Sequence, residues 1–203
     1  MSTLKSSFEE DIPKSINAYN IDKEFRQGLF STEFLGTNKY TDEQVCIKIY
    51  SKENIRRNTA ALKFINGEIF SLKLVHHKSF PQLLEFFETN SHIFIVTDLP
   101  KGKTIENILK EKKTIAESEA KKIFYKIVEA MTYLHSIFIC HRYIHPSNIY
   151  YDEASGDIKI VNFFYSKFYE ANDKQLNEDI GHPTFCYKLF ILLNLNFIKF
   201  LRK

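Results

Sequence analysis

The pattern of apolar residues changes once along this chain, just after Asp98. Before that point, short runs of β-branched and other apolar residues predict strands at 44–50, 83–87 and 92–96. One segment of this front half, residues 53–75, instead has its apolar residues at helical spacing. After the change, apolar residues three and four apart, from Ala120 to Leu134, form one face of an amphipathic helix. The chain therefore predicts an α+β fold with a β-rich front half and a helical back half.

Composition excludes several classes of protein. With 44% hydrophobic and 26% charged residues, and only 6 Gly and 5 Pro, the 203-residue chain is neither collagen-like nor disordered. Its net charge of +3 is too small to indicate binding to nucleic acid, and we expect no such partner. The three cysteines, Cys46, Cys140 and Cys186, have no repeating spacing. They predict no disulfide framework and favour a reducing compartment, so we expect a cytoplasmic or nuclear protein.

The two ends of the chain carry no clear membrane or secretion signal. Residues 1–14 are polar and acidic, so a cleaved secretion signal is not expected. The most apolar stretch, 189–201, is interrupted by Asn194, Asn196 and Lys199. Spanning a bilayer takes about 20 largely apolar residues, so we expect no transmembrane segment. A buried segment, or a tail that lies on a partner or on a membrane surface, fits this stretch better.

Four sequence features follow one another in a fixed order. Val45-Cys46-Ile47-Lys48 predicts a strand that ends in a lysine, and Glu68 lies in the helical segment twenty positions later. After the amphipathic helix come H-R-Y-I-H-P-S-N at residues 141–148 and I-V-N-F-F at residues 160–164. Each feature alone is weak, because a lysine in a strand is usually a solvated edge residue. Together, in this order and at this spacing, they resemble a eukaryotic protein kinase domain.

The resemblance extends from about Tyr19 to Cys186. The hairpin sequence E-T-N-S-H-I at residues 88–93 is similar to the calcium/calmodulin-dependent and AMP-activated group of Ser/Thr kinases. The resemblance implies a two-lobe fold. Its N-lobe, residues 19–97, is expected to contain a five-stranded antiparallel sheet and one helix, and its helical C-lobe is expected at residues 98–186.

Outside these lobes we expect a flexible tail at residues 1–18 and a divergent apolar tail at residues 187–203. The sequence G-H-P-T-F-C at 181–186 is similar to the segment that precedes the family's A-P-E motif. The chain continues with Tyr187-Lys188-Leu189 instead, so the C-lobe is expected to be incomplete.

The resemblance assigns six residues to nucleotide binding: Gly28, Lys48, Glu68, Thr97, Asp98 and Leu99. In the family the strand lysine contacts the phosphates and the helix glutamate holds it, while the gatekeeper and hinge residues meet the adenine. The glycine-rich loop is damaged, because only Gly28 remains of its three glycines. Glu33 falls where an aliphatic residue covers the adenine, and desolvating a carboxylate there is costly. We therefore expect at most weak affinity for ATP.

The catalytic loop and the metal site depart further from the family. The aspartate of H-R-D handles the proton of the substrate hydroxyl, and the asparagine that follows in this loop holds a metal ion. Here Tyr143 stands at the aspartate position, and a phenol with a pKa of about 10 is a poor base at neutral pH. Asn148 is kept, but Asn162 replaces the metal-binding aspartate of D-F-G. Because a neutral amide lacks the charge that Mg²⁺ favours, we expect a poor Mg²⁺ site at Asn148 and Asn162.

The packing positions of the family are better preserved than the chemistry. Four residues match the stacked positions that tie the two lobes of a kinase together: Leu72, Leu83, His141 and Phe163. Three of them are apolar, and the fourth is the histidine usual in the family. A preserved scaffold with altered catalytic groups is typical of a pseudokinase.

Three functions remain open at this point. The first is a catalytically inactive pseudokinase that acts by binding a protein, such as an active kinase or a substrate protein. The second is a weak, ATP-dependent Ser/Thr kinase in which solvent or His145 replaces the missing base. The third is a nucleotide-binding switch without phosphate transfer.

Overall fold

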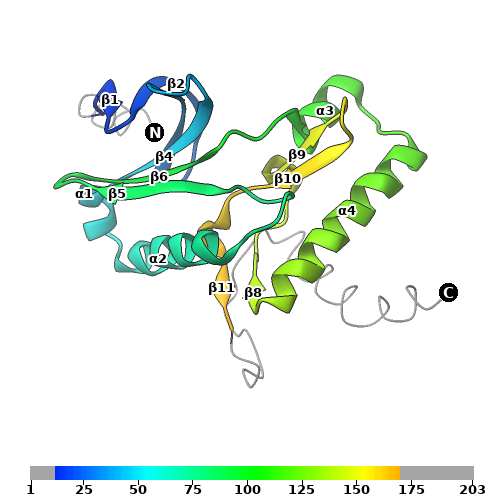
Figure 1. Ribbon diagram of the computed structural model, residues 1–203. Helices are drawn as coiled ribbons and strands as arrows, with labels where there is room; N and C mark the ends of the chain where they lie inside the picture. The colour runs from blue at the N-terminus through cyan, green and yellow to red at the C-terminus, as the bar shows by residue number, and fades with distance from the viewer. Residues whose placement is uncertain (1–11, 170–203) are drawn as a thin grey trace. The chain divides into compact units, whose positions relative to one another are not determined.

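The structure is a computed structural model, and it describes residues 12–169 (Figure 1). Its strands are β1 Ser15–Ile16, β2 Tyr19–Gln27, β3 Ser31–Asn38, β4 Gln44–Ser51, β5 Leu83–Glu88, β6 His92–Asp98, β7 Lys103–Thr104, β8 Ile139–Cys140, β9 Ile149–Asp152, β10 Asp157–Ile160 and β11 Lys167–Phe168. Its helices are α1 Lys52–Arg56, α2 Thr59–Leu74, α3 Ile105–Lys112 and α4 Glu117–Ser136, with 3₁₀ turns at Pro146–Asn148 and Phe163–Tyr165.

The chain divides into two compact units. The first comprises the chain up to Lys63 together with Gln82–Leu99, and the second comprises Phe64–Pro81 together with the chain from Pro100 onward. Most of α2 therefore belongs to the second unit, although its first residues lie in the first.

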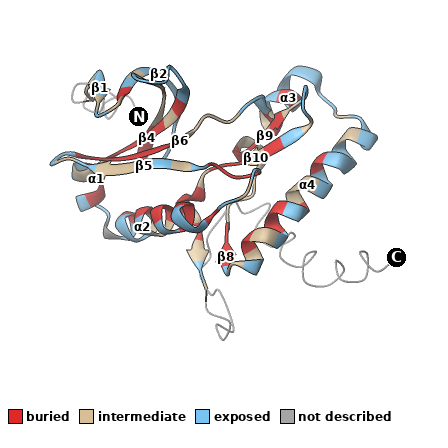
Figure 2. Ribbon diagram, in the orientation of Figure 1, coloured by how far each residue is buried: buried red, intermediate tan, exposed pale blue. Residues whose placement is uncertain are grey.

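An antiparallel sheet forms the first unit, with strand order β1-β2-β3-β4-β6-β5. The β4 strand lies between β3 and β6 and is buried along most of its length, as is β6 (Figure 2). Successive side chains of a strand point to opposite faces. On one face, Val45, Ile47 and Ile49 of β4 pack with Phe94 and Val96 of β6. The sequence prediction of strands at 44–50, 83–87 and 92–96 is confirmed, including the hairpin between β5 and β6.

A sixth, two-residue strand extends the five strands expected for this sheet. Ser15 and Ile16 of β1 pair with Asn20 and Tyr19 of β2, and Ile16 packs against the apolar core. The expectation of a flexible tail up to residue 18 is thereby corrected for this segment. Isolated apolar residues in a polar stretch give no strand pattern, so the sequence did not reveal their packing. Residues 1–11 lie outside the described part of the chain.

The helical segment expected at 53–75 consists of two helices, α1 and α2, which are separated at Arg57 and Asn58. Gly67 lies where α2 comes close to another segment of the backbone. A Cβ at this position would lie 3.1 Å from the carbonyl oxygen of Ser166, so α2 runs close to the backbone that follows the N-F-F sequence. A small residue is needed where a helix approaches another backbone so closely.

The amphipathic helix of the second unit is confirmed as α4. Its buried stripe packs against β10 and β8, and consists of Ile123, Val128, Ala130, Met131 and Leu134. Phe124, which the sequence places on the same apolar face, is 49% exposed instead.

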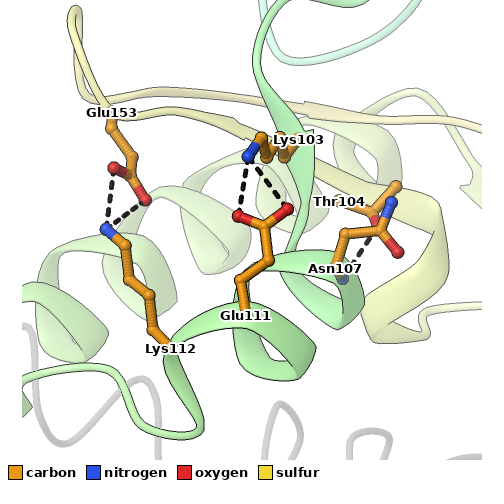
Figure 3. Close-up of polar contacts among 6 residues, drawn as sticks. All are labelled: Lys103, Thr104, Asn107, Glu111, Lys112 and Glu153. Atoms are coloured by element: carbon orange, nitrogen blue, oxygen red, sulfur yellow. Dashed lines mark hydrogen bonds and ion pairs between the residues drawn. The ribbon is translucent and has the colours of Figure 1, made fainter.

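Helix α3 begins at a side-chain cap. The hydroxyl oxygen of Thr104 accepts a hydrogen bond of 3.2 Å from the backbone N–H of Asn107 (Figure 3). The helix ends at Lys112. Ion pairs tie it to its surroundings: Lys103 of β7 pairs with Glu111 at 2.6 Å, and Lys112 pairs with Glu153 at 2.7 Å. These pairs are half exposed, so solvent screening leaves each with only a small stabilising effect.

Two parts of the sequence interpretation, the 181–186 segment and the 187–203 tail, lie outside the described residues. Among the helices that the structure describes, none combines the length and apolar character needed to cross a membrane.

The strand β7 is preceded by a glycine that the backbone requires. Gly102 has a φ of +81°, and a Cβ there would collide with the carbonyl group of Tyr151. Gly156 also has a positive φ, of +71°, but a Cβ there would meet open space. We expect Gly156→Ala to cost about 1–2 kcal/mol, the penalty of the backbone conformation alone. Gly102→Ala should cost about 1–3 kcal/mol more because of the collision.

Urea unfolding of the two variants beside the wild type measures this difference. Equal losses of stability in Gly102→Ala and Gly156→Ala would contradict the close approach between β7 and β9.

Candidate nucleotide and catalytic site

Lys48 lies in the middle of the sheet of the first unit. On β4 it is paired with Glu33 of β3 on one side and with Ile95 of β6 on the other. The lysine is buried, and its Nζ atom lies 5.3 Å from the centre of the Tyr50 ring. Glu68, its expected partner, is buried on α2 and belongs to the second unit. The Lys48–Glu68 ion pair therefore stays a prediction.

A carboxylate faces the same side of the sheet as Lys48. Residues directly opposite in adjacent strands project to the same face, so Glu33 and Lys48 share it. The Glu33 carboxylate also lies 4.0 Å from the guanidinium of Arg26, which is opposite it on β2. Burial raises the pKa of the neighbouring Cys46 thiol, and the negative charge of Glu33 raises it further. The strand pairing thus places a charged group where the family has an aliphatic one.

The remaining glycine of the phosphate loop closes the turn between β2 and β3. The backbone N–H of Gly28 donates to the carbonyl oxygen of Ser31 at 2.8 Å. Ser31 occupies the position of the family's third glycine and is buried. Between these residues Leu29 is largely exposed.

The gatekeeper and hinge positions follow one another at the end of β6. Thr97 is buried, and Leu99 is the last residue of the first unit. Between them, the carboxylate of Asp98 accepts a hydrogen bond of 2.7 Å from the backbone N–H of Gln82. The N–H of Asp98 donates in turn to the carbonyl oxygen of Gln82 at 3.2 Å. The Asp98 side chain thus fixes the chain where it enters β5.

In the second unit, His141 anchors the catalytic loop from inside the core. Its Nδ1 accepts a hydrogen bond from the backbone N–H of Tyr143 at 3.3 Å, so its Nε2 carries the proton and donates to the carbonyl oxygen of Val161 at 3.1 Å. The imidazole packs edge-on against Phe163, with 4.7 Å between ring centres. Burial lowers the pKa of His141 to about 4. The histidine is therefore neutral at physiological pH and acts as a packing and hydrogen-bonding residue.

Tyr143, at the position of the catalytic aspartate, belongs to an aromatic cluster. Its ring meets Tyr165 edge-on at 5.1 Å and lies nearly parallel to His145 at 6.5 Å. Tyr165 contacts Phe64 of α2 and Phe164 in turn. Burial raises the pKa of Tyr165, and the neighbouring Tyr143 raises it further. Tyr165 therefore stays a neutral phenol at physiological pH.

The two asparagines of the expected metal site lie together. The buried Asn148 donates from Nδ2 to the carbonyl oxygen of Tyr143 at 3.0 Å. Its Oδ1 accepts from Nδ2 of Asn162 at 3.4 Å. The backbone N–H of Val161 also donates to the carbonyl oxygen of Asn148 at 2.9 Å. The structure thus brings Tyr143, Asn148 and Asn162 into one hydrogen-bonded group.

Comparison with known proteins identifies the family. The sequence profile of the protein kinase domain matches residues 19–187. The chain belongs to the protein kinase family. It is 32% identical to a probable myosin light chain kinase of Dictyostelium discoideum over 170 residues. These residues make up 82% of this chain and 43% of that protein. It is 31% identical to the serine/threonine-protein kinase SIK2 of Gallus gallus over 173 residues. These residues make up 85% of this chain and 21% of that protein.

The relatives support the group expected from the hairpin sequence. An SNF-related serine/threonine-protein kinase of Homo sapiens is 28% identical over 162 residues, which make up 79% of this chain and 21% of that protein. Together these matches place the chain among Ser/Thr protein kinases of the calcium/calmodulin-dependent and AMP-activated kind. The kinase-like fold and the family are thereby confirmed. The chain spans less than half of the length of these relatives.

The donor set of this kinase domain does not fit Mg²⁺. The ion prefers carboxylate oxygens beside substrate phosphates, and neither Asn148 nor Asn162 brings a negative charge. The Oδ1 atom of Asn148 already accepts a hydrogen bond from Asn162, and its Nδ2 is a donor. Within residues 12–169, no cluster of three or more His, Cys, Asp or Glu side chains could hold a metal ion elsewhere.

Several contacts of the site were not predicted from the sequence. Arg142 donates from Nε to the carbonyl oxygen of Tyr165 at 2.6 Å. Ser166 donates its hydroxyl to that of Ser71 on α2 at 2.9 Å, in a buried position. Two sequence features could have indicated that this turn packs against α2. They are the run of aromatic residues at 163–165 and the glycine at position 67.

The neutral state of His141 predicts a loss of stability in acid. The unfolded chain binds a proton near pH 6.5 whereas the folded chain does so near pH 4, so stability falls as the pH drops through this interval. Protonation of Nδ1 also removes the acceptor for the N–H of Tyr143. We expect His141→Gln to be less stable than the wild type at pH 7.5, but to lose less stability between pH 7.5 and pH 5.

Urea unfolding at both pH values measures this. Burial also lowers the pKa values of His77 and His135, so the variant keeps part of the pH dependence. Equal losses in the variant and the wild type would contradict a buried, neutral His141.

Proposed function

We propose that this kinase domain is a pseudokinase, which acts by binding another protein and does not transfer phosphate. The observation that carries the proposal is Tyr143 in its aromatic cluster. Removal of a general base typically costs about 10²- to 10⁴-fold in rate, and a phenol packed against Tyr165 and His145 is no substitute at neutral pH. The neutral Asn162 supports the same conclusion, because the charge that grips magnesium is missing.

The nucleotide side of the site also supports weak binding. Glu33 shares a face with Lys48 and lies beside Arg26, so a fixed carboxylate accompanies the cations that would receive phosphate. Ser31 stands in place of a phosphate-loop glycine. We propose at most weak affinity for ATP through Gly28, Lys48, Glu68, Thr97, Asp98 and Leu99.

The proposed partner is a protein, such as an active kinase or a substrate protein. Apolar side chains that remain exposed on α2 support this: Leu62, Phe70 and Leu74. Their spacings of eight and four place them along one side of the helix. We also propose an intracellular location, cytoplasmic or nuclear, which accords with the free Cys46 and Cys140.

A phosphate-transfer assay tests the central proposal. Purified protein is incubated with radiolabelled ATP, Mg²⁺ and a generic protein substrate, beside the matched variant Lys48→Ala. We expect no incorporation above that of Lys48→Ala. Incorporation that depends on Lys48 would overturn the proposal and favour a weak Ser/Thr kinase. In that event Tyr143→Asp should raise the rate by about 10²- to 10⁴-fold, since it restores the missing base.

A thermal-shift titration with ATP tests the nucleotide-switch alternative. A ligand that binds the folded state raises Tm in proportion to RT ln(1 + [L]/Kd). With millimolar ATP, with or without Mg²⁺, we expect little or no rise in the wild type. A clear rise in Tm that is lost in Lys48→Ala would instead identify a nucleotide-binding domain.

A further inference from the structure

The hydrogen bonds of Asn148 fix which way its amide points. Its Nδ2 donates to the carbonyl oxygen of Tyr143 at 3.0 Å, and a carbonyl can only accept. The other end of the same amide, Oδ1, is therefore directed to residue 162, where Nδ2 of Asn162 donates to it at 3.4 Å. Asn148 is fully buried, so water does not readily replace these partners. Residue 162 thus supplies a donor to this oxygen.

The backbone holds Asn162 in place for this role. Asn162 has a φ of +69° and a ψ of 70°, in the left-handed region that asparagine adopts more readily than most residues. The residue before it, Val161, donates its N–H to the carbonyl oxygen of Asn148 and accepts at its own carbonyl from His141. Main-chain and side-chain hydrogen bonds thus both join the catalytic loop, residues 141–148, to residues 161 and 162.

We infer that Asn148 and Asn162 form a metal-free clasp, in which an amide–amide hydrogen bond joins the catalytic loop to the 162–165 turn and selects against a divalent cation. An aspartate at 162 would direct its carboxylate oxygens at Oδ1 of Asn148. Two acceptors would then face one another in a part-buried site with no proton between them, which is unfavourable unless a cation bridges them. The amide of Asn162 supplies the donor and needs no cation.

The clasp goes beyond the proposed function, with which it shares Asn162. It describes how the folded loop is held, whether or not phosphate is transferred. Its ligand chemistry is also definite: any nucleotide that binds this domain does so without Mg²⁺ on these two residues.

Thermal and urea unfolding of variants, in chelator and in Mg²⁺ without nucleotide, tests the clasp. Asn162→Ala removes one hydrogen bond and should raise the unfolding equilibrium constant about 2- to 10-fold, regardless of Mg²⁺. Asn162→Asp should raise it more in chelator, on the order of 10- to 100-fold, and Mg²⁺ should restore much of this loss. The wild type should not respond to Mg²⁺. Asn90→Asp, in the exposed β5–β6 turn, adds the same charge as a matched control and should respond to neither condition.

Two results would overturn the clasp. One is a wild type whose Tm rises with Mg²⁺ alone, and the other is an Asn162→Asp variant as stable in chelator as Asn90→Asp. If Asn162→Asp is recovered only unfolded in chelator, refolding in Mg²⁺ becomes the readout, and failure to recover folded protein counts against the clasp. Lys48-dependent phosphate transfer would overturn the proposed function and leave these stabilities unchanged, so the two failures are distinguishable.

Discussion

The buried side chain of Asn148 connects the parts of the catalytic region. Its amide binds the carbonyl oxygen of Tyr143 on one side and the amide of Asn162 on the other, while its main chain binds His145 and Val161. One residue thus holds the catalytic loop, the start of β9 and the turn at 162–165 together. These four hydrogen bonds join neutral groups, so none of them needs a bound cation for charge balance.

Neutral groups also make the other main contacts described for the second unit. His141 packs on Phe163 as a neutral ring, Phe64 of α2 packs on Phe164, and Ser71 bonds to Ser166. Apolar contacts and neutral hydrogen bonds make no demand on the catalytic charges, because burial of apolar surface is the main stabilising term in folding. A chain can therefore keep this kinase architecture while an aspartate position becomes Tyr143 and another becomes Asn162.

The sequence predicted the elements whose apolar periodicity was strong, namely β4, the β5–β6 hairpin and α4. Its motifs also indicated the protein kinase family. It did not predict β1, because two residues leave no measurable alternation. Nor did it predict the exposure of Phe124, because helical spacing does not say how much of α4 other segments cover. The motif assigns Tyr143 and Asn162 to two aspartate positions of the family, and this assignment stays a prediction. Their neighbours, above all Tyr165 and the amide of Asn148, come from tertiary contacts that spacing does not encode.

The account holds that this domain keeps the kinase scaffold and lacks the groups that grip a divalent metal. NMR of ¹⁵N-labelled protein with ATP and Mn²⁺, a paramagnetic substitute for Mg²⁺, tests this at the atoms concerned. We expect the side-chain amide signals of Asn148 and Asn162 to keep their intensity as Mn²⁺ is added. Selective loss of these two signals, with exposed asparagine amides unaffected, would place a metal ion between them and contradict it.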